Sequence, residues 1–362
     1  MSELDLKDYV FRKGAVNRIP VSGTFELTAR CNLSCKMCYV HLSKDEQAKM
    51  GAELTAREWI ELGREAVDAG MIYLLLTGGE PLLRPDFEEI YTALIKMGLM
   101  ITVNTNATLM TPRIAELFRV HRPEKVNVTL YGMSDQTYGG LCGNCHGFEK
   151  AMAGIQMLKE AGVRVNLNTT FTKYNIQDLD KIVDFAKENQ LPVRMTGFLF
   201  PPVRNGHTPE DVYLSPEEMG RYAAHFDRIT LTPEKYEERR DFIRKCLDRQ
   251  PTELEPGECS ISSCMAGRGA FWISWDGSMY PCGMLPQIAE DVRQEGFSGA
   301  WKKICVDTAA MPVPSECRVC RYQKVCPSCA AVSMSLTGKT DGLADVLCRR
   351  TKAYVDVFLS DT

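Results

Sequence analysis

The sequence lacks an excess of positive charge, a long apolar run and the apolar core of a signal peptide. Its 362 residues include 43 Lys and Arg against 47 Asp and Glu, a formal charge of −4. A nucleic-acid-binding face needs clustered Lys and Arg, so we expect no nucleic-acid partner. No stretch approaches the roughly 18 apolar residues of a membrane span, and the N-terminus is charged. We therefore expect a cytoplasmic protein with no membrane partner.

Cysteine is abundant instead, with 15 residues. Apolar residues make up 44% and charged residues 25%, as in ordinary globular proteins, and a chain of this length buries a sizeable core without disulfides. Secreted disulfide-rich domains are usually much shorter, and an odd number of cysteines cannot pair completely. Most of the thiols are therefore expected to have a role other than disulfide bonding.

The first 200 residues alternate between two patterns. Apolar segments rich in β-branched residues predict strands at 24–28, 72–77, 101–104, 126–130, 164–170 and 193–199. Helices are predicted between them from the capping box Thr55–Glu58 and from apolar stripes over 87–97, 114–118, 148–162 and 179–186. This alternation is typical of parallel βαβ units, so we predict an α/β fold whose sheet is open or curved into a partial barrel.

The pattern changes after residue 199. A turn-rich loop and a charged helix over 234–249 come first, and cysteines become dense beyond residue 258, where a hairpin at 270–281 is the clearest element. This second module has too few periodic apolar residues to be held by a core alone, so metal is expected to support it. We predict an N-terminal extension, a core barrel, a helical linker and a loop-rich module ending in a helix, over 1–19, 20–200, 201–257 and 258–362.

Three cysteines follow the first predicted strand directly. Cys31, Cys35 and Cys38 have the spacing C-x3-C-x2-C at the carboxyl end of a strand, where α/β folds place their chemistry. Three thiolates could hold three irons of a [4Fe–4S] cluster and leave the fourth iron open to a small molecule. Zinc is one alternative, although it prefers four ligands and the nearest histidine is His41. Three free thiols are the other.

The segment Thr77–Pro81, with the sequence TGGEP, ends the second predicted strand about forty residues downstream. Together with the cysteine motif it resembles the radical S-adenosylmethionine (radical SAM) superfamily, over residues 20–199. The resemblance implies a partial (β/α)6 barrel and a [4Fe–4S] cluster on the three cysteines, whose open iron binds S-adenosylmethionine. Reductive cleavage of S-adenosylmethionine would then give a 5′-deoxyadenosyl radical that abstracts hydrogen from the substrate.

Further cofactor contacts follow from the same resemblance. Glycines let backbone approach a ligand, and a carboxylate can accept from an ammonium group, so Gly78, Gly79 and Glu80 are expected to hold the methionyl amino group. Met37 stands where the family usually has an aromatic residue near the adenine. Polar residues at other strand ends are expected to bind the ribose, adenine or carboxylate, or to act only as turn and capping residues. They are Asn106, Thr129 and Asn168.

Apart from Cys305, the C-terminal module contains eight cysteines. A zinc ribbon accounts for the run Cys317-x2-Cys320-x5-Cys326-x2-Cys329, but eight thiols equal two complete four-cysteine sites. The pattern over 258–349 resembles the SPASM extension of radical SAM enzymes. That resemblance implies a first auxiliary [4Fe–4S] cluster on Cys259, Cys264, Cys282 and Cys329, and a second on Cys317, Cys320, Cys326 and Cys348. Three [4Fe–4S] clusters are then expected in all. Without Cys259 as a ligand, the first auxiliary cluster would have an open iron.

Four cysteines remain. Cys246 and Cys305 lie beside apolar residues and are predicted to pack in the core. Cys142 and Cys145 fall in a glycine-rich segment over 139–147, predicted as a loop beside the site. Either thiol could donate a hydrogen atom to a substrate radical or anchor a substrate, or the segment could be a tight loop of small residues.

The SPASM resemblance favours a peptide substrate, modified by crosslinking or epimerisation. Sulfatase maturation is disfavoured because Gly283 follows Cys282 where those enzymes carry an aspartate base. About twenty residues precede the first strand, so recognition of a leader peptide would fall to a separate protein or to the barrel. The alternatives are a dehydrogenase or carbon-skeleton enzyme on a small metabolite or haem-pathway intermediate, and a zinc or iron–sulfur scaffold without catalysis. A reductant such as flavodoxin or ferredoxin is the other expected partner, in an anaerobic or strongly reducing cytoplasm.

Overall fold

The computed structural model describes residues 6–196, 198–204, 209–248, 264–309 and 311–360. The predicted ligand Cys259 lies outside these ranges. No helix in the described part of the chain is both long and apolar enough to cross a membrane.

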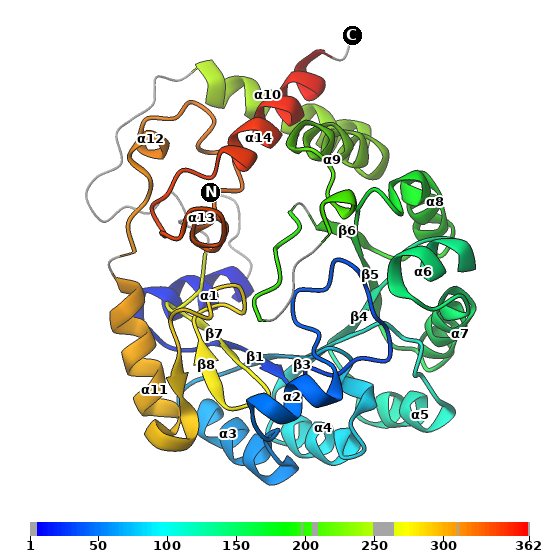
Figure 1. Cartoon of the computed structure of the whole chain (residues 1–362), viewed down its shortest axis with the longest axis vertical. Coiled ribbons are helices and arrows are strands. Elements are labelled where there is room, and N and C mark those ends of the chain that lie inside the picture. Colours follow the sequence, from blue (N-terminus) through cyan, green and yellow to red (C-terminus); the bar gives the residue numbers. More distant parts are fainter. Residues whose placement is uncertain (1–5, 197, 205–208, 249–263, 310, 361–362) are drawn as a thin grey trace.

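Six parallel strands form the centre of the fold, as predicted, in the order β6-β5-β4-β3-β2-β1. They are β1 (Ser22–Glu26), β2 (Tyr73–Thr77), β3 (Met100–Thr105), β4 (Lys125–Thr129), β5 (Val165–Thr170) and β6 (Val193–Thr196). The connecting helices are α3 (Ala56–Asp68), α4 (Phe87–Lys96), α5 (Pro112–Val120), α7 (Gly147–Glu160) and α8 (Leu179–Glu188). Figure 1 shows these helices as an outer layer around the curved sheet, which makes the fold a partial α/β barrel.

Local sequence signals account for the start of several helices. The Thr55 hydroxyl and the Glu58 carboxylate form the predicted capping box at the start of α3. Thr111 caps α5, with Pro112 in its first turn. Once begun, each helix packs its apolar stripe on the outer face of the sheet; the ring of Trp59 lies 4.9 Å from that of Phe25.

The two faces of the sheet differ in chemistry. One row across the outer face is apolar and buried, and consists of Phe25, Leu76, Val103, Val126 and Val165. Because side chains alternate along a strand, the neighbouring residues face the interior of the barrel. That inner row is polar and consists of Glu26, Thr77, Asn104, Asn127 and Asn166. The barrel interior is therefore suited to a polar ligand rather than to a packed apolar core.

The sheet continues beyond β1 into the C-terminal part of the chain. Strand β7 (Ala270–Ile273) pairs in parallel with β1, and β8 (Ser278–Tyr280) and β9 (Glu290–Asp291) follow in antiparallel order. The predicted hairpin at 270–281 is confirmed by β7 and β8. It does not stand apart from the barrel, because it extends the same nine-stranded sheet across the domain boundary expected at residue 258.

Helices also cover the C-terminal half. They are α9 (Pro216–Thr230), α10 (Pro233–Asp248), α11 (Val292–Ala309), α12 (Ser315–Arg318), α13 (Ala330–Thr337) and α14 (Asp345–Ser360). Helix α14 lies along α9 (Figure 1), and Phe358 is fully buried there, with its ring 4.4 Å from that of Tyr236. This second core holds the end of the chain against the helices that follow the barrel.

Six helices of the described part of the chain occur where none was predicted. Three lie in the first half, namely α1 (Leu6–Asn17), α2 (Lys44–Met50) and α6 (Asp135–Cys142). The other three, α11, α12 and α13, lie in the C-terminal module that was expected to be loop-rich. Three single 3-10 turns complete the description at Pro81–Leu83, Ile176–Asp178 and Glu210–Val212.

Helix α6 corrects the prediction of a glycine-rich loop over 139–147. The Ser134 hydroxyl accepts a hydrogen bond from the Thr137 N–H and caps the helix, and Tyr138 and Leu141 are fully buried beneath it. This packing outweighs the low helix propensity of the glycine pair at 139–140. Cys142 is consequently the last residue of a helix, which Gly143 ends in the left-handed conformation at φ 69°.

Candidate functional site

The cysteine triad lies in the loop that follows β1, at the carboxyl end of the barrel. Burial raises the pKa of Cys31 to about 12 and that of Cys38 to about 11, and the neighbouring thiols add to both shifts. The three side chains therefore lie close enough to repel one another as thiolates. Bound iron would remove this repulsion by neutralising the charge, so the donor set fits a metal cluster.

Glycine backbone from the end of β2 supports the approach to this loop. The Gly79 N–H donates to the Thr28 carbonyl at 2.7 Å, and the Glu80 N–H donates to the Arg30 carbonyl at 2.9 Å. A Cβ at Gly78 would lie 2.6 Å from the Thr28 oxygen, and one at Gly79 would lie 2.3 Å from the Arg30 oxygen. The two glycines thus allow close backbone contact with residues 28–30. Their predicted contact with a ligand stays a prediction.

The Glu80 side chain is fully buried and joins two strands. Its Oε1 accepts from the Thr105 hydroxyl at 2.8 Å and from the Leu82 N–H at 3.1 Å, while Oε2 accepts from the Asn106 N–H at 2.8 Å. Burial raises the pKa of Glu80 to about 7 in spite of these bonds. The carboxylate therefore has a structural task at the ends of β2 and β3, and its contact with an amino group stays a prediction.

Asn106 lies directly beside the cysteine loop. Its Nδ2 donates to the Asn32 Oδ1 at 3.0 Å and lies 3.7 Å from the Cys31 sulfur. Its own Oδ1 accepts from the Thr108 N–H at 2.9 Å, which fixes the amide orientation. Asn106 thus connects the end of β3 to the first predicted ligand of the cluster.

The remaining predicted cofactor contacts lie on the interior of the barrel or beside it. Thr129 and Asn168 are register partners on β4 and β5 and face inward, in the same row as Arg194 on β6. Met37 is 5% exposed and packs within the main core. The roles of these three predicted residues toward S-adenosylmethionine stay predictions.

The structure brings three of the first auxiliary set together. Burial raises the pKa of Cys282 to about 11, and repulsion from Cys329 and Cys264 adds to the shift. The partly buried Tyr39, next to Cys38, is influenced by the charges of both Cys38 and Cys282. This set therefore lies on the side of the C-terminal module that faces the cysteine triad.

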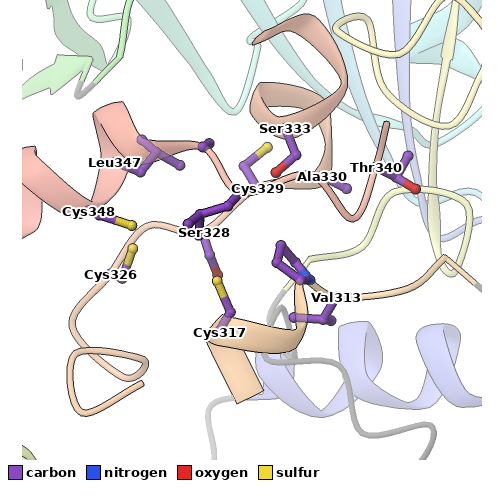
Figure 2. Close-up of a pocket in the computed structure, with 13 residues that line it drawn as sticks. Val313, Cys317, Cys326, Ser328, Cys329, Ala330, Ser333, Thr340, Leu347 and Cys348 are labelled. Atoms are coloured by element: carbon purple, nitrogen blue, oxygen red, sulfur yellow. The ribbon is translucent and has the colours of Figure 1, made fainter. Parts of the chain in front are cut away.

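The second auxiliary set also converges. Burial raises the pKa of Cys317 to about 11. Repulsion from the charges of Cys348, Cys326 and Cys320 adds to this shift, in decreasing order of size. Figure 2 shows the sulfur atoms of Cys326 and Cys348 facing each other across a small pocket, with the Cys317 sulfur beside them. The Cys329 sulfur turns away toward α13 (Figure 2). Cys329 therefore groups with Cys282 rather than with the run that a zinc ribbon would use.

Within the described ranges, no three Cys, His, Asp or Glu side chains meet closely enough to hold a single metal ion.

The ion pair between Arg204 and Glu26 connects the barrel to the C-terminal strands, and the sequence did not indicate it. The Arg204 guanidinium donates to the Glu26 Oε2 at 2.7 Å, the Val40 carbonyl at 2.7 Å and the Ser274 hydroxyl at 2.9 Å. The Trp272 Nε1 also donates to that Glu26 oxygen, at 3.0 Å. The hydrogen-bonded residues of this network lie 70 to 246 positions apart in the sequence, so no local sequence pattern could have revealed it.

The two unassigned thiols have different environments. Cys142 is fully buried next to the cysteine loop, whereas Cys145 is exposed three residues beyond it. Cys305 packs against the main core, as predicted, and Cys246 is partly buried on α10. The predicted role of Cys142 or Cys145 as a hydrogen-atom donor stays a prediction.

Comparison with known proteins agrees with the site and the fold. Residues 25–186 match the model of the radical SAM superfamily. An AdoMet-dependent heme synthase from Methanosarcina barkeri is 30% identical over 337 residues, which cover 90% of this chain and 95% of the relative. A PqqA peptide cyclase from Rhizobium meliloti is 25% identical over 345 residues, covering 92% and 88%. The chain therefore belongs to the radical SAM superfamily.

A solved structure shows the same fold. Streptococcus suis SuiB bound to S-adenosylmethionine superposes with a TM-score of 0.67 at 18% identity, over 91% of this chain and 77% of the other. Membership of the superfamily implies a [4Fe–4S] cluster and S-adenosylmethionine, and the fit of the cysteine triad agrees with both. The chain is a radical SAM enzyme.

Proposed function

We propose that this enzyme forms haem from an iron porphyrin that carries extra carboxylate side chains. The observation that carries the proposal is the match to the Methanosarcina heme synthase, which extends over nearly the whole of both chains. The haem-pathway alternative of the sequence analysis is thereby favoured over the peptide substrate.

The interior of the barrel supports an anionic substrate. Lys125 on β4 and Arg194 on β6 both face inward, since they alternate with the outward Val126 and Val193. Burial lowers the pKa of Lys125, the neighbouring carboxylate of Glu124 raises it, and the positive charges of Lys7, Arg194 and Arg164 lower it. These cations repel one another although Glu124 offsets part of the repulsion, and a bound carboxylate would relieve it further.

The proposed division of roles follows the geometry. When bound, the [4Fe–4S] cluster and S-adenosylmethionine together supply a radical that removes a hydrogen atom from the substrate. Cys31, Cys35 and Cys38 would hold that cluster. Asn106, Thr129, Asn168 and Met37 would orient S-adenosylmethionine, together with the glycine segment at 78–79.

Two auxiliary [4Fe–4S] clusters are part of the proposal. The grouping of Cys264, Cys282 and Cys329, with Cys259 as fourth ligand, supports the first, and the convergence of Cys317, Cys320, Cys326 and Cys348 supports the second. Full ligation by protein suits electron transfer, so these clusters would accept the electron that an oxidised substrate must lose. A flavodoxin or ferredoxin would supply the electron that starts each turnover.

A peptide substrate is the second candidate. The relation to the PqqA peptide cyclase favours it, and so does the position of β6 at the end of the sheet. In the described part of the chain, β6 pairs with a strand on one side only, so an extended peptide could add to its free edge. On this reading the exposed Cys145 is better placed than Cys142 to meet a substrate radical.

One incubation distinguishes the two. The anaerobically reconstituted enzyme, with S-adenosylmethionine and dithionite, would receive either iron porphyrins with three or four propionate groups or candidate peptides. The proposal predicts haem, detected by mass spectrometry, together with 5′-deoxyadenosine. A modified peptide and an unchanged porphyrin would overturn it.

A matched pair of variants tests the recognition step. Arg194→Ala removes an inward cation, and we expect the KM for the porphyrin to rise about tenfold or more, the loss of one charge-assisted contact. Lys187→Ala removes an exposed cation from α8 on the outer layer and should leave KM unchanged. Equal KM values for Arg194→Ala and the unaltered enzyme would contradict the role of the inner wall.

A further inference from the structure

The C-terminal end of α6 holds the cysteine loop on both sides of Cys35. The Ser34 N–H donates to the Cys142 carbonyl at 3.0 Å, and the Lys36 N–H donates to the Leu141 carbonyl at 3.0 Å. Two consecutive carbonyl groups at the end of a helix would otherwise lack partners, so both segments gain from the contact. The result fixes Cys35 directly against the last turn of α6.

Two side chains with polar hydrogens meet Cys35 from this side. The bond with the fully buried Cys142 raises the pKa of Cys35, so the Cys35 thiol donates it while it is protonated, whereas the bond from the Tyr131 hydroxyl lowers that pKa, so Tyr131 is the donor. Once Cys35 has lost its proton, the Cys142 thiol is left as the partner that can donate. Tyr131 comes from the chain just beyond β4. The contact therefore joins residues from three separate parts of the barrel.

Tyr131 is held rigidly in its place. Its ring packs edge-to-face on Tyr138, with centroids 5.8 Å apart and an interplanar angle of 84°. Its carbonyl accepts from the Asn175 Nδ2 at 2.8 Å, and Asn175 is itself fully buried. The hydroxyl is thus aimed by packing and backbone bonds that do not depend on the cluster.

We propose that Cys142 and Tyr131 are positioning residues that donate hydrogen bonds to the sulfur of Cys35 and raise the reduction potential of the cluster on the cysteine triad. A cysteine that ligates iron has lost its proton, so its sulfur can only accept. Donated bonds stabilise the extra negative charge of the reduced cluster more than that of the oxidised one. The inference holds for a porphyrin and for a peptide substrate alike, because it concerns only the step that reduces the cluster.

The test is a redox titration of the reconstituted full-length enzyme, followed by electron paramagnetic resonance. The cluster of Cys142→Ala and that of Tyr131→Phe should each be harder to reduce. We expect the one-electron equilibrium constant to fall about threefold to tenfold, which corresponds to roughly 30–60 mV toward more negative potential. Cys142→Ser keeps a hydrogen-bond donor of similar size, so the potential of its cluster should lie close to that of the unaltered enzyme.

Cys145→Ala is the matched control, because it removes an exposed thiol three residues from Cys142. It should leave the potential of the cluster unchanged. If Cys142→Ala fails to retain iron, Tyr131→Phe decides alone, since it removes only a hydroxyl. Potentials in Cys142→Ala and Tyr131→Phe that equal the unaltered value, at full iron content, would overturn the proposal and leave Cys142 as a packing residue.

Discussion

At the scale of single residues, the cysteine triad depends on side chains and glycines that are not ligands. Glu80 and Asn106 connect the ends of β2 and β3 to the loop, and Gly79 brings β2 against Arg30, just before Cys31. Each of these positions has a steric or electrostatic reason that a substitution can test.

Gly79→Ala should destabilise the protein and weaken cluster retention. The new Cβ would lie 2.3 Å from the Arg30 carbonyl oxygen, so the backbone entering the cysteine loop must shift. We expect a loss of about 1–3 kcal/mol in denaturant unfolding and a lower iron content. Gly140→Ala in α6 is the control, because its Cβ meets nothing nearer than 3.7 Å and a helix favours alanine over glycine. Equal stability of the two variants would contradict the steric argument.

Glu80 should make stability fall as the pH rises. Its pKa is about 7 in the fold against an ordinary value of 4.5, so the folded state retains a proton that the unfolded chain has lost. The stabilisation is complete below pH 4.5 and is lost as the pH rises to about 7, by about 1.4 kcal/mol per pH unit within that window. Urea unfolding between pH 5.5 and 8 should show this slope for the unaltered chain. Glu80→Gln does not titrate, so its stability relative to the unaltered chain should increase as the pH rises toward 7. A stability difference that is constant with pH would refute the raised pKa of Glu80.

At the scale of elements, the regular part of the barrel follows from local patterns. Each of the six predicted strands is present because alternating apolar and polar residues suit a sheet with helices outside and a polar interior. Thr55 and Thr111 mark helix starts through caps that the sequence displays. Helix α6 could not be predicted in this way, since its stability comes from the burial of Tyr138 and Leu141 beneath it.

The candidate site also has a part that the sequence predicts and a part that it does not. The cysteine spacing and the TGGEP segment were visible in the sequence because they are local. The contacts of Tyr131 and Arg204 were not, because their partners lie in distant parts of the chain. For the same reason, the sequence could not show that the fold also uses the two glycines to pack backbone on backbone, and their contact with a ligand stays a prediction.

Helix α14 carries one of the proposed auxiliary ligands, so loosening it should affect iron selectively. Phe358→Ala removes a fully buried ring that packs on Tyr236, at a cost of about 3–5 kcal/mol. We expect the loss of about four irons per chain, because Cys348 lies at the other end of the same helix. Lys352→Ala, on the exposed side of α14, should retain them. Loss of all iron from Phe358→Ala would show that the clusters are not separate.

The whole molecule depends on contact between the barrel and the C-terminal strands. Arg204→Met would leave the Glu26 carboxylate, 1% exposed, without its cation, at a cost of about 3–5 kcal/mol. The double change Glu26→Leu with Arg204→Met should cost less than Arg204→Met alone, because it removes the buried charge as well. Thermal or denaturant unfolding measures both. A double variant less stable than the single one would show that the pair is stabilising in itself.

The central claim is that three thiols of the barrel hold a catalytic cluster beside two auxiliary clusters. The most direct measurement compares iron content and 5′-deoxyadenosine formation in the reconstituted enzyme and in the triple change of Cys31, Cys35 and Cys38 to Ala. The unaltered chain should bind about twelve irons and release 5′-deoxyadenosine under reducing conditions, and the triple variant should bind about eight and release none. Zinc in place of iron, or cleavage of S-adenosylmethionine by the triple variant, would contradict the account.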